Sequence, residues 1–163
     1  MSKPYMWGET SGSKSAIDLK PKVAEKLLAK AKSVLFILGS DLNEYPPKTL
    51  KKIIEKANST VVETGSAKAS DIGIEADSRY GIVEVVDLLC SDDGWRGRHD
   101  YVVFVGVPYH IESRMLSGLR LCNVGRTITL NRRHQQYADF SFPNILRPKF
   151  WEKSLKEIAK NMQ

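Results

Sequence analysis

Val34-Leu35-Phe36-Ile37-Leu38-Gly39 decides the fold of this chain, because it is an apolar run of six residues that ends in glycine. A strand with one solvent-facing side alternates apolar and polar residues, whereas a parallel strand that is buried on both faces is continuously apolar. Polar Ser40 and Asp41 follow the run, and Pro46-Pro47 then begins a helix. The run therefore predicts a central strand of a Rossmann-like parallel sheet, in which ligands bind at the carboxyl ends of the strands.

The alternation of apolar strand and amphipathic helix continues along the whole chain. Apolar spacing predicts helices over 21–32, after Pro46-Pro47, over 82–90, after Pro108, and from Trp151 to the end of the chain. Further strands are predicted over 60–64, 101–106 and 127–130, with a short edge strand around Phe140-Ser141-Phe142. This order predicts a three-layer α/β/α fold with a mostly parallel sheet. We expect 33–39 in the middle of the sheet, 60–64 on one side of it, and the three later strands on the other side.

The length and composition favour one domain. The chain has 163 residues, of which 42% are hydrophobic, enough for one sizeable core. Residues 1–19 are rich in Ser, Gly and Lys and predict a polar tail, in which Tyr5, Met6 and Trp7 form a cluster that can dock on a partner. Residues 20–163 are expected to form the single Rossmann-like domain. Its apolar stretches are shorter than the roughly 18 residues of a membrane span, and the start lacks a signal sequence, so we expect a cytoplasmic protein without membrane contact.

The net charge of +6 is divided unevenly along the chain. Residues 1–60 carry 11 basic and 6 acidic side chains, residues 61–100 carry 4 and 9, and residues 101–163 carry 10 and 4, giving +5, −5 and +6. Most lysines lie on the polar sides of predicted helices and are not interleaved with exposed aromatic residues, which disfavours a nucleic-acid partner. The basic faces suit an acidic protein partner.

The two cysteines and three histidines predict no metal site. Cys90 and Cys122 lie in apolar helical patterns and are expected to be small buried residues, in preference to a disulfide. Two cysteines are too few for an iron–sulfur cluster, so a redox metal would belong to a partner. His99, His110 and His134 show no ligand spacing and are interpreted as ordinary surface or loop residues.

The loops after the predicted strands are the candidate ligand sites. The first loop, Gly39-Ser40-Asp41-Leu42-Asn43-Glu44, lacks the G-x-G-x-x-G fingerprint and would bring two carboxylates near a phosphate, which disfavours ordinary NAD binding. Small residues in two later loops would let backbone N–H groups approach a ligand. The candidate cofactor-binding residues are Gly39, Ser40, Thr64, Gly65, Ser66, Gly106, Pro108 and Tyr109. The alternative is that the glycines merely end strands. No nucleophile elbow, P-loop or carboxylate pair is present, which favours a binding or assembly domain over an independent enzyme.

Three segments together resemble a known family. They are the helix and strand of 21–39, Asp100-Tyr101-Val102-Val103-Phe104-Val105-Gly106-Val107-Pro108-Tyr109, and Tyr137-Ala138-Asp139-Phe140-Ser141-Phe142-Pro143-Asn144. The chain resembles, over nearly its whole length, the epsilon subunits of the archaeal carbon monoxide dehydrogenase/acetyl-CoA decarbonylase-synthase complex. In that family, Gly is common where Pro143 stands, and an aromatic residue is common at the position of His110.

The resemblance carries several expectations. It implies a domain of the deoxyhypusine-synthase-like NAD/FAD-binding type and a homo- or hetero-oligomer. The implied partner is the large nickel–iron–sulfur alpha subunit that oxidises CO. The implied role is non-catalytic stabilisation of the alpha–epsilon component that interconverts CO and CO2, with no cofactor of its own. The alternative implied role is to assist electron transfer by binding FAD.

Overall fold

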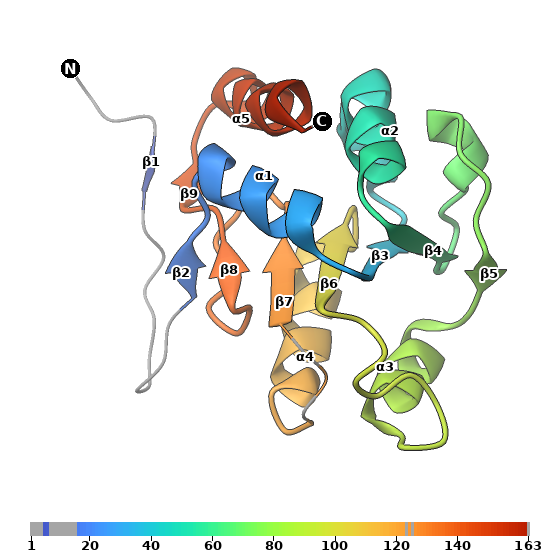
Figure 1. Ribbon diagram of the computed structural model, residues 1–163. Coiled ribbons are helices and arrows are strands. Elements are labelled where there is room, and N and C mark those ends of the chain that lie inside the picture. The colour runs from blue at the N-terminus through green and yellow to red at the C-terminus, as the bar shows by residue number, and fades with distance from the viewer. Residues whose placement is uncertain (1–4, 7–15, 123, 125, 163) are drawn as a thin grey trace.

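The computed structural model describes residues 5–6, 16–122, 124 and 126–162, and its middle layer is a seven-stranded, all-parallel sheet (Figure 1). From one edge to the other, the strands are β2 (Ile17–Asp18), β8 (Phe140–Ser141), β7 (Arg126–Thr129), β6 (Tyr101–Val105), β3 (Val34–Leu38), β4 (Ser59–Glu63) and β5 (Ser78–Arg79). Phe36 of β3 lies in register with Val61 on one side and Val103 on the other. The predicted fold class and the predicted order of the central strands are confirmed.

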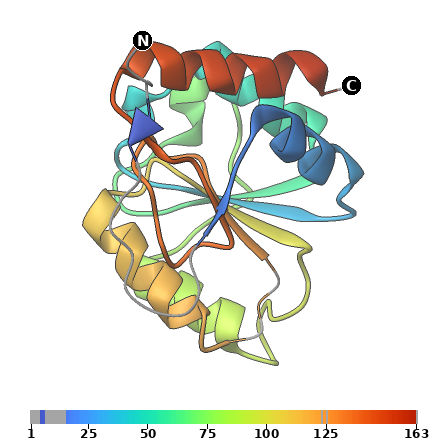
Figure 2. The same cartoon turned by 90° about the vertical axis from the view of Figure 1, so that its left-hand side faces the viewer.

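Five α-helices of the described segments form the two outer layers. Helices α1 (Pro21–Lys30), α2 (Pro47–Lys56) and α5 (Pro148–Asn161) cover one face, and α3 (Ile82–Cys90) and α4 (Tyr109–Leu119) cover the other. Figure 2 shows α5 and α1 on one side of the fanned strands and α4 on the opposite side. Helices α1, α2 and α5 each begin with a proline, whose fixed φ and missing N–H suit the first helical turn. None of the described helices combines the length and apolarity needed to cross a bilayer.

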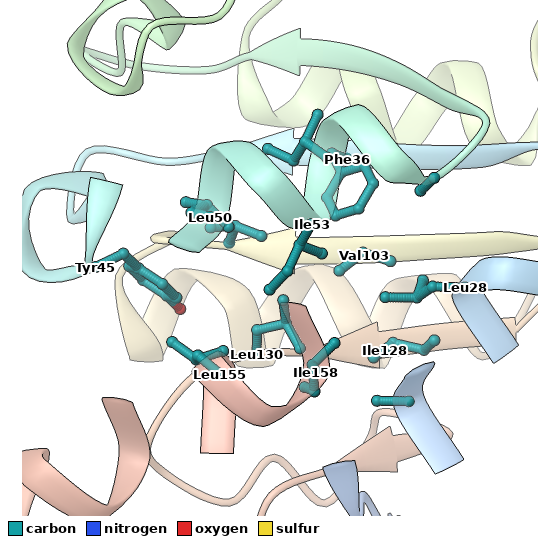
Figure 3. Packing of buried hydrophobic residues seen from close by; sticks show 14 of the residues in the cluster. Leu28, Phe36, Tyr45, Leu50, Ile53, Val103, Ile128, Leu130, Leu155 and Ile158 are labelled. Atoms are coloured by element: carbon teal, nitrogen blue, oxygen red, sulfur yellow. The ribbon is translucent and has the colours of Figure 1, made fainter. Parts of the chain in front are cut away.

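The continuous apolar run of β3 serves two cores. Val34, Phe36 and Leu38 pack with the layer that contains α1, α2 and α5, whereas Leu35 and Ile37 pack with the layer of α3 and α4. Figure 3 shows the first of these cores, where Phe36 and Val103 of the sheet lie near Ile53 and Ile158 of the helices. Successive side chains of a strand point to opposite faces, so a run without polar residues is needed where helices cover both.

The predicted boundary of the N-terminal tail is wrong at its carboxyl end. Ile17 and Asp18 form the edge strand β2 beside β8, and Leu19 is buried. Earlier in the chain, β1 (Tyr5–Met6) pairs antiparallel with β9 (Asn144–Ile145). Trp7, the third residue of the predicted docking cluster, lies outside the described residues. The prediction rested on the polar composition of the segment, and strands of two residues are too short to show the periodic apolar pattern that would have revealed them.

Two short 3-10 helices complete the described elements: η1 (Leu42–Glu44) follows β3, and η2 (Ala69–Ile72) lies between β4 and β5.

The expectation of unpaired cysteines is also wrong. Cys90 at the end of α3 forms a disulfide with Cys122, just beyond α4. The two residues are 32 positions apart in the chain, but α3 and α4 pack against each other and bring their ends together. Since this proximity arises from helix packing, the helical pattern around each cysteine could not reveal it.

Candidate functional site

The sheet has one topological switch point, between β3 and β6. From β3 the chain proceeds to β4 on one side, and from β6 it proceeds to β7 on the other. In open α/β sheets the loops diverge at such a point and leave a crevice at the carboxyl ends of the strands. A pocket of about 290 Å³ lies there, and we refer to it as the switch-point pocket. Its lining consists of residues 41, 44 and 45 after β3, 106–110 after β6, 131–133 after β7, and Trp151 of α5. Its volume is near the lower end for small-molecule sites.

Three of the predicted cofactor-binding residues line this pocket: Gly106, Pro108 and Tyr109. Gly39 lies immediately behind them, where its N–H donates to Val105 O at 2.9 Å, while Asp41 N–H donates to Gly106 O at 2.7 Å. Gly106 has φ +74°, and a Cβ on it would lie 2.6 Å from Leu42 N. The two glycines therefore let the loops after β3 and β6 touch each other. Ser40, which is exposed, does not line the pocket.

The other predicted loop, Thr64-Gly65-Ser66, lies at the end of β4 and is not part of the pocket. Thr64 is buried, and its hydroxyl donates to Leu38 O at 2.7 Å. Arg79 of β5 donates to Gly65 O at 2.5 Å and pairs with Glu63 at 2.7 Å. These bonds tie the ends of β3, β4 and β5 together, so the contacts of this loop are structural.

The rim of the pocket carries both signs of charge. Asp41 and Glu44 come from the loop after β3, and Arg132 and Arg133 come from the loop after β7. The Arg133 guanidinium lies 5.8 Å from the centre of the Tyr109 ring, in cation–π range. The Tyr109 hydroxyl in turn donates to His134 O at 2.9 Å. Tyr109 is thus held between the loops after β6 and β7, with a cation over its face.

The inner wall of the pocket is aromatic. Tyr45 and Trp151 meet edge to face, with ring centroids 4.6 Å apart, and the Trp151 indole N–H donates to Leu130 O at 2.9 Å. Figure 3 shows Tyr45 at the margin of the core, beside Leu155. Burial raises the pKa of the Tyr45 hydroxyl, and the nearby Glu112 carboxylate raises it further. Tyr45 is therefore a neutral group that can donate or accept a hydrogen bond.

Glu112 is a buried acid that the sequence analysis did not identify. Its side chain lies behind Asn131, whose Nδ2 donates to Glu112 Oε2 at 3.3 Å, and Glu112 Oε1 has no hydrogen-bond partner within the described residues. Burial raises the pKa of this carboxyl to about 7, although the side chains of Thr129 and Asn131 partly oppose the shift. A signal was present in the sequence: Glu112 lies three, four and seven residues before Met115, Leu116 and Leu119, which form the buried stripe of α4. Buried, strongly perturbed acids are enriched at functional sites.

The histidines differ from one another more than predicted. His110 is exposed on the pocket rim and His99 is half-buried. His134 lies in the loop after β7, as its assignment as a surface or loop residue allows, but it is buried. Its backbone N–H donates to Asn144 Oδ1 at 2.7 Å, because the loop after β7 folds back against the segment after β8. In the described part of the chain, no three His, Cys, Asp or Glu side chains form a group that could hold a metal ion.

Comparison with known proteins gives consistent matches over almost the whole chain. The family model "CO dehydrogenase beta subunit/acetyl-CoA synthase epsilon subunit" matches residues 2–159. The acetyl-CoA decarbonylase/synthase complex subunit epsilon of Methanothermobacter thermautotrophicus is 34% identical over 152 residues, which cover 87% of this chain and 86% of that protein. Subunit epsilon 1 of the same complex from Archaeoglobus fulgidus is 29% identical, covering 92% of this chain and 86% of its own. Subunit epsilon 1 from Methanosarcina barkeri is 26% identical, covering 82% of each chain.

Proposed function

This chain belongs to the family of CO dehydrogenase beta subunits and acetyl-CoA synthase epsilon subunits, and from that premise we propose that it stabilises the CO-oxidising component of an acetyl-CoA decarbonylase/synthase complex. In this role it is a non-catalytic subunit that binds the large nickel–iron–sulfur alpha subunit. The observation that carries the proposal is the extent of the family match. Residues 2–159 include every strand of the sheet and nearly all of the last helix, so the entire domain is the shared unit.

The chemistry of the chain supports an accessory role. Both cysteines of the sequence are joined in the Cys90–Cys122 disulfide, so neither thiolate is available to a cluster. The switch-point pocket offers neutral Tyr45 and a mixed-charge rim, and the buried acid Glu112 lies behind its lining residue Asn131. The described residues that line the pocket form no nucleophile–base pair. Under this proposal, the nickel and iron chemistry belongs to the partner subunit.

The test is co-expression of this chain with the large subunit. We expect the two to copurify at a fixed ratio, and we expect the CO-oxidising activity of the large subunit to survive heating longer when this chain is bound, because a ligand of the native state stabilises it. An unrelated protein of similar size and charge is the control. A large subunit that is equally long-lived alone, with no complex on gel filtration, would disprove the stabilising role.

A second candidate role is binding of a flavin or dinucleotide to assist electron transfer. The pocket at the switch point favours it, because this is where doubly wound sheets bind nucleotides. Arg132 and Arg133 suit a pyrophosphate and Tyr109 suits a ring, but about 290 Å³ holds only part of FAD. The rest of the molecule would lie outside the pocket. FAD, if bound, would supply the one- and two-electron chemistry, while these residues would only bind and orient it.

This alternative has its own test. Titration of the chain with FAD, followed by flavin fluorescence, should show saturable binding that Tyr109→Ala and Arg133→Glu weaken. Gly65→Ala, in the loop outside the pocket, is the control. Fluorescence that stays that of free FAD at high micromolar protein would exclude the role for the isolated chain.

A further inference from the structure

A larger hollow lies at the opposite edge of the sheet, where the strands begin. Its volume is about 700 Å³, and its two walls come from α1 and from the segment that leads into β6 and β7. Lys26 and Lys30, one helical turn apart, stand on the α1 side. On the other side stand Arg126, at the first position of β7, and Gly97, His99, Asp100 and Tyr101. We refer to this hollow as the amino-edge groove.

The amino-edge groove is positively charged. Lys26, Lys30 and Arg126 are exposed, and none of them has an ion-pair partner within the part of the chain that the structure describes. Asp100 is the one carboxylate that lines it, and its Oδ2 already accepts the backbone N–H of Lys32 at 2.8 Å. Three cations against one engaged carboxylate in a concave site concentrate a positive potential that attracts anions.

The base of the groove is apolar and ordered. Leu27, Ala31 and Tyr101 are half-buried and pack against the core formed with α1, α2 and α5. His99 also lines the groove, and its Nδ1 shares a hydrogen bond of 2.7 Å with the Ser33 hydroxyl, which fixes the ring. The groove thus presents cations on both walls beside an apolar surface that includes an aromatic ring.

We propose that the amino-edge groove binds a phosphorylated small molecule of about the size of a nucleoside diphosphate. Its phosphates would contact Lys26, Lys30 and Arg126, and its apolar or planar part would lie against Leu27, Ala31 and Tyr101. The volume falls within the roughly 300–1,000 Å³ of small-molecule sites. Nine residues line the groove, fewer than the roughly 20–30 that each side of a stable protein interface contributes. Nothing in this inference depends on the partner subunit or on the switch-point pocket.

The probe is ADP, titrated calorimetrically into the full chain. Binding should be saturable and should weaken as salt rises, because exposed charges are screened. Adenosine has the planar group without phosphates, and inorganic phosphate lacks the planar group, so each should bind much more weakly than ADP. Arg126→Glu and the pair Lys26→Glu/Lys30→Glu should each weaken ADP binding by about 10- to 100-fold, the effect of losing charge-assisted hydrogen bonds.

The matched control is Lys48→Glu/Lys52→Glu, which makes the same change of charge at the same spacing on exposed positions of α2. It should leave the affinity for ADP within about twofold, since distant exposed charges are largely screened. Three results would overturn the proposal: no ADP binding at millimolar concentration, equal affinity for inorganic phosphate and ADP, or loss of ADP binding through Arg133→Glu but not through the groove variants. The last result would place the nucleotide in the switch-point pocket and support the flavin-type alternative.

Discussion

Gly39 and Val107 are in backbone contact, so that a Cβ on Gly39 would lie only 2.3 Å from Val107 Cα. This contact joins the loop after β3 to the loop after β6, the two loops that diverge around the switch-point pocket. A glycine is therefore required at position 39 because the backbone of the neighbouring loop leaves no room for a Cβ. Its own φ angle lies outside the positive region and does not require glycine. The glycine that ends the β3 run positions one wall of the pocket.

Gly39→Ala should destabilise the chain by about 2–3 kcal/mol, because the added methyl group must push two loop backbones apart. The control is Gly65→Ala. Gly65 has φ +58° but open space around its Cβ position, so only the cost of the left-handed conformation applies, about 1–2 kcal/mol. Urea unfolding measures both. A Gly39→Ala variant as stable as the parent would show that the loops do not pack as described.

The stability of the chain should depend on the proton of Glu112. Burial raises the pKa of this carboxyl from 4.5 to about 7 in the folded chain, so the folded state binds the proton more tightly than the unfolded state. The contribution of Glu112 to the free energy of unfolding is therefore greatest below about pH 4.5, falls as pH rises to about 7, and is constant above that. Glu112→Gln removes this dependence.

The expected result is a stability difference that grows with pH. Urea titrations measure the free energy of unfolding of both proteins. Between pH 5 and pH 7.5, the value for the Gln variant should rise relative to that of the parent by on the order of 2 kcal/mol, since one pKa unit corresponds to about 1.4 kcal/mol. Subtracting the two curves cancels the other titrating groups, which both proteins share. A difference that does not change with pH would mean that Glu112 is ionised in the folded state.

Reduction of the Cys90–Cys122 disulfide should destabilise the chain by about 3–4 kcal/mol, the loop-entropy value for a bridge that spans 32 residues. A reductant should lower the melting temperature of the parent but leave the double variant Cys90→Ser/Cys122→Ser unaffected. A thiol assay under denaturing, non-reducing conditions should find no free thiol. Two free thiols in that assay would show that the cysteines are unpaired.

Deletion of residues 1–15 should weaken copurification with the large subunit, because the segment contains Tyr5 and Trp7 and aromatic side chains contribute strongly to interfaces. The deletion removes β1 and leaves β2 and the seven-stranded sheet intact, so the melting temperature should change little. Replacing both Tyr5 and Trp7 by Ala in the full chain separates the aromatic contribution from the length of the segment. Full-strength association of the truncated chain would place the interface elsewhere.

The fold was predictable because its signals are local. The β3 run has no polar residue, and this property alone implies a strand covered on both faces, as found for Phe36 and Ile37 in the two opposite cores. The helix starts at Pro21 and Pro47 could be predicted without knowledge of neighbouring elements. The strand order followed from the short, right-handed connections that parallel strands require.

The candidate site was predictable only in part. Gly106, Pro108 and Tyr109 follow a strong strand and do line the pocket, while Thr64-Gly65-Ser66 follows an equally clear strand and lies outside it. The two loops differ because their strands lie at different distances from the switch point. The loop after β6 lies at the switch point, where neighbouring loops diverge and leave a crevice, whereas β4 lies one strand away from it. The loop after β7 also lines the pocket, because β7 is the neighbour of β6; it contributes Asn131, Arg132 and Arg133.

By itself, the sequence determined the class of fold, the order of the central strands and the position of the glycines that end them, because apolar periodicity and turn chemistry act over a few neighbouring residues. Only the tertiary structure decided that Cys90 meets Cys122, that His134 is buried, and that Lys26 and Arg126 face one groove. These relationships join residues from different elements, and the twist of the sheet and the packing of helices on it set the distances between those elements.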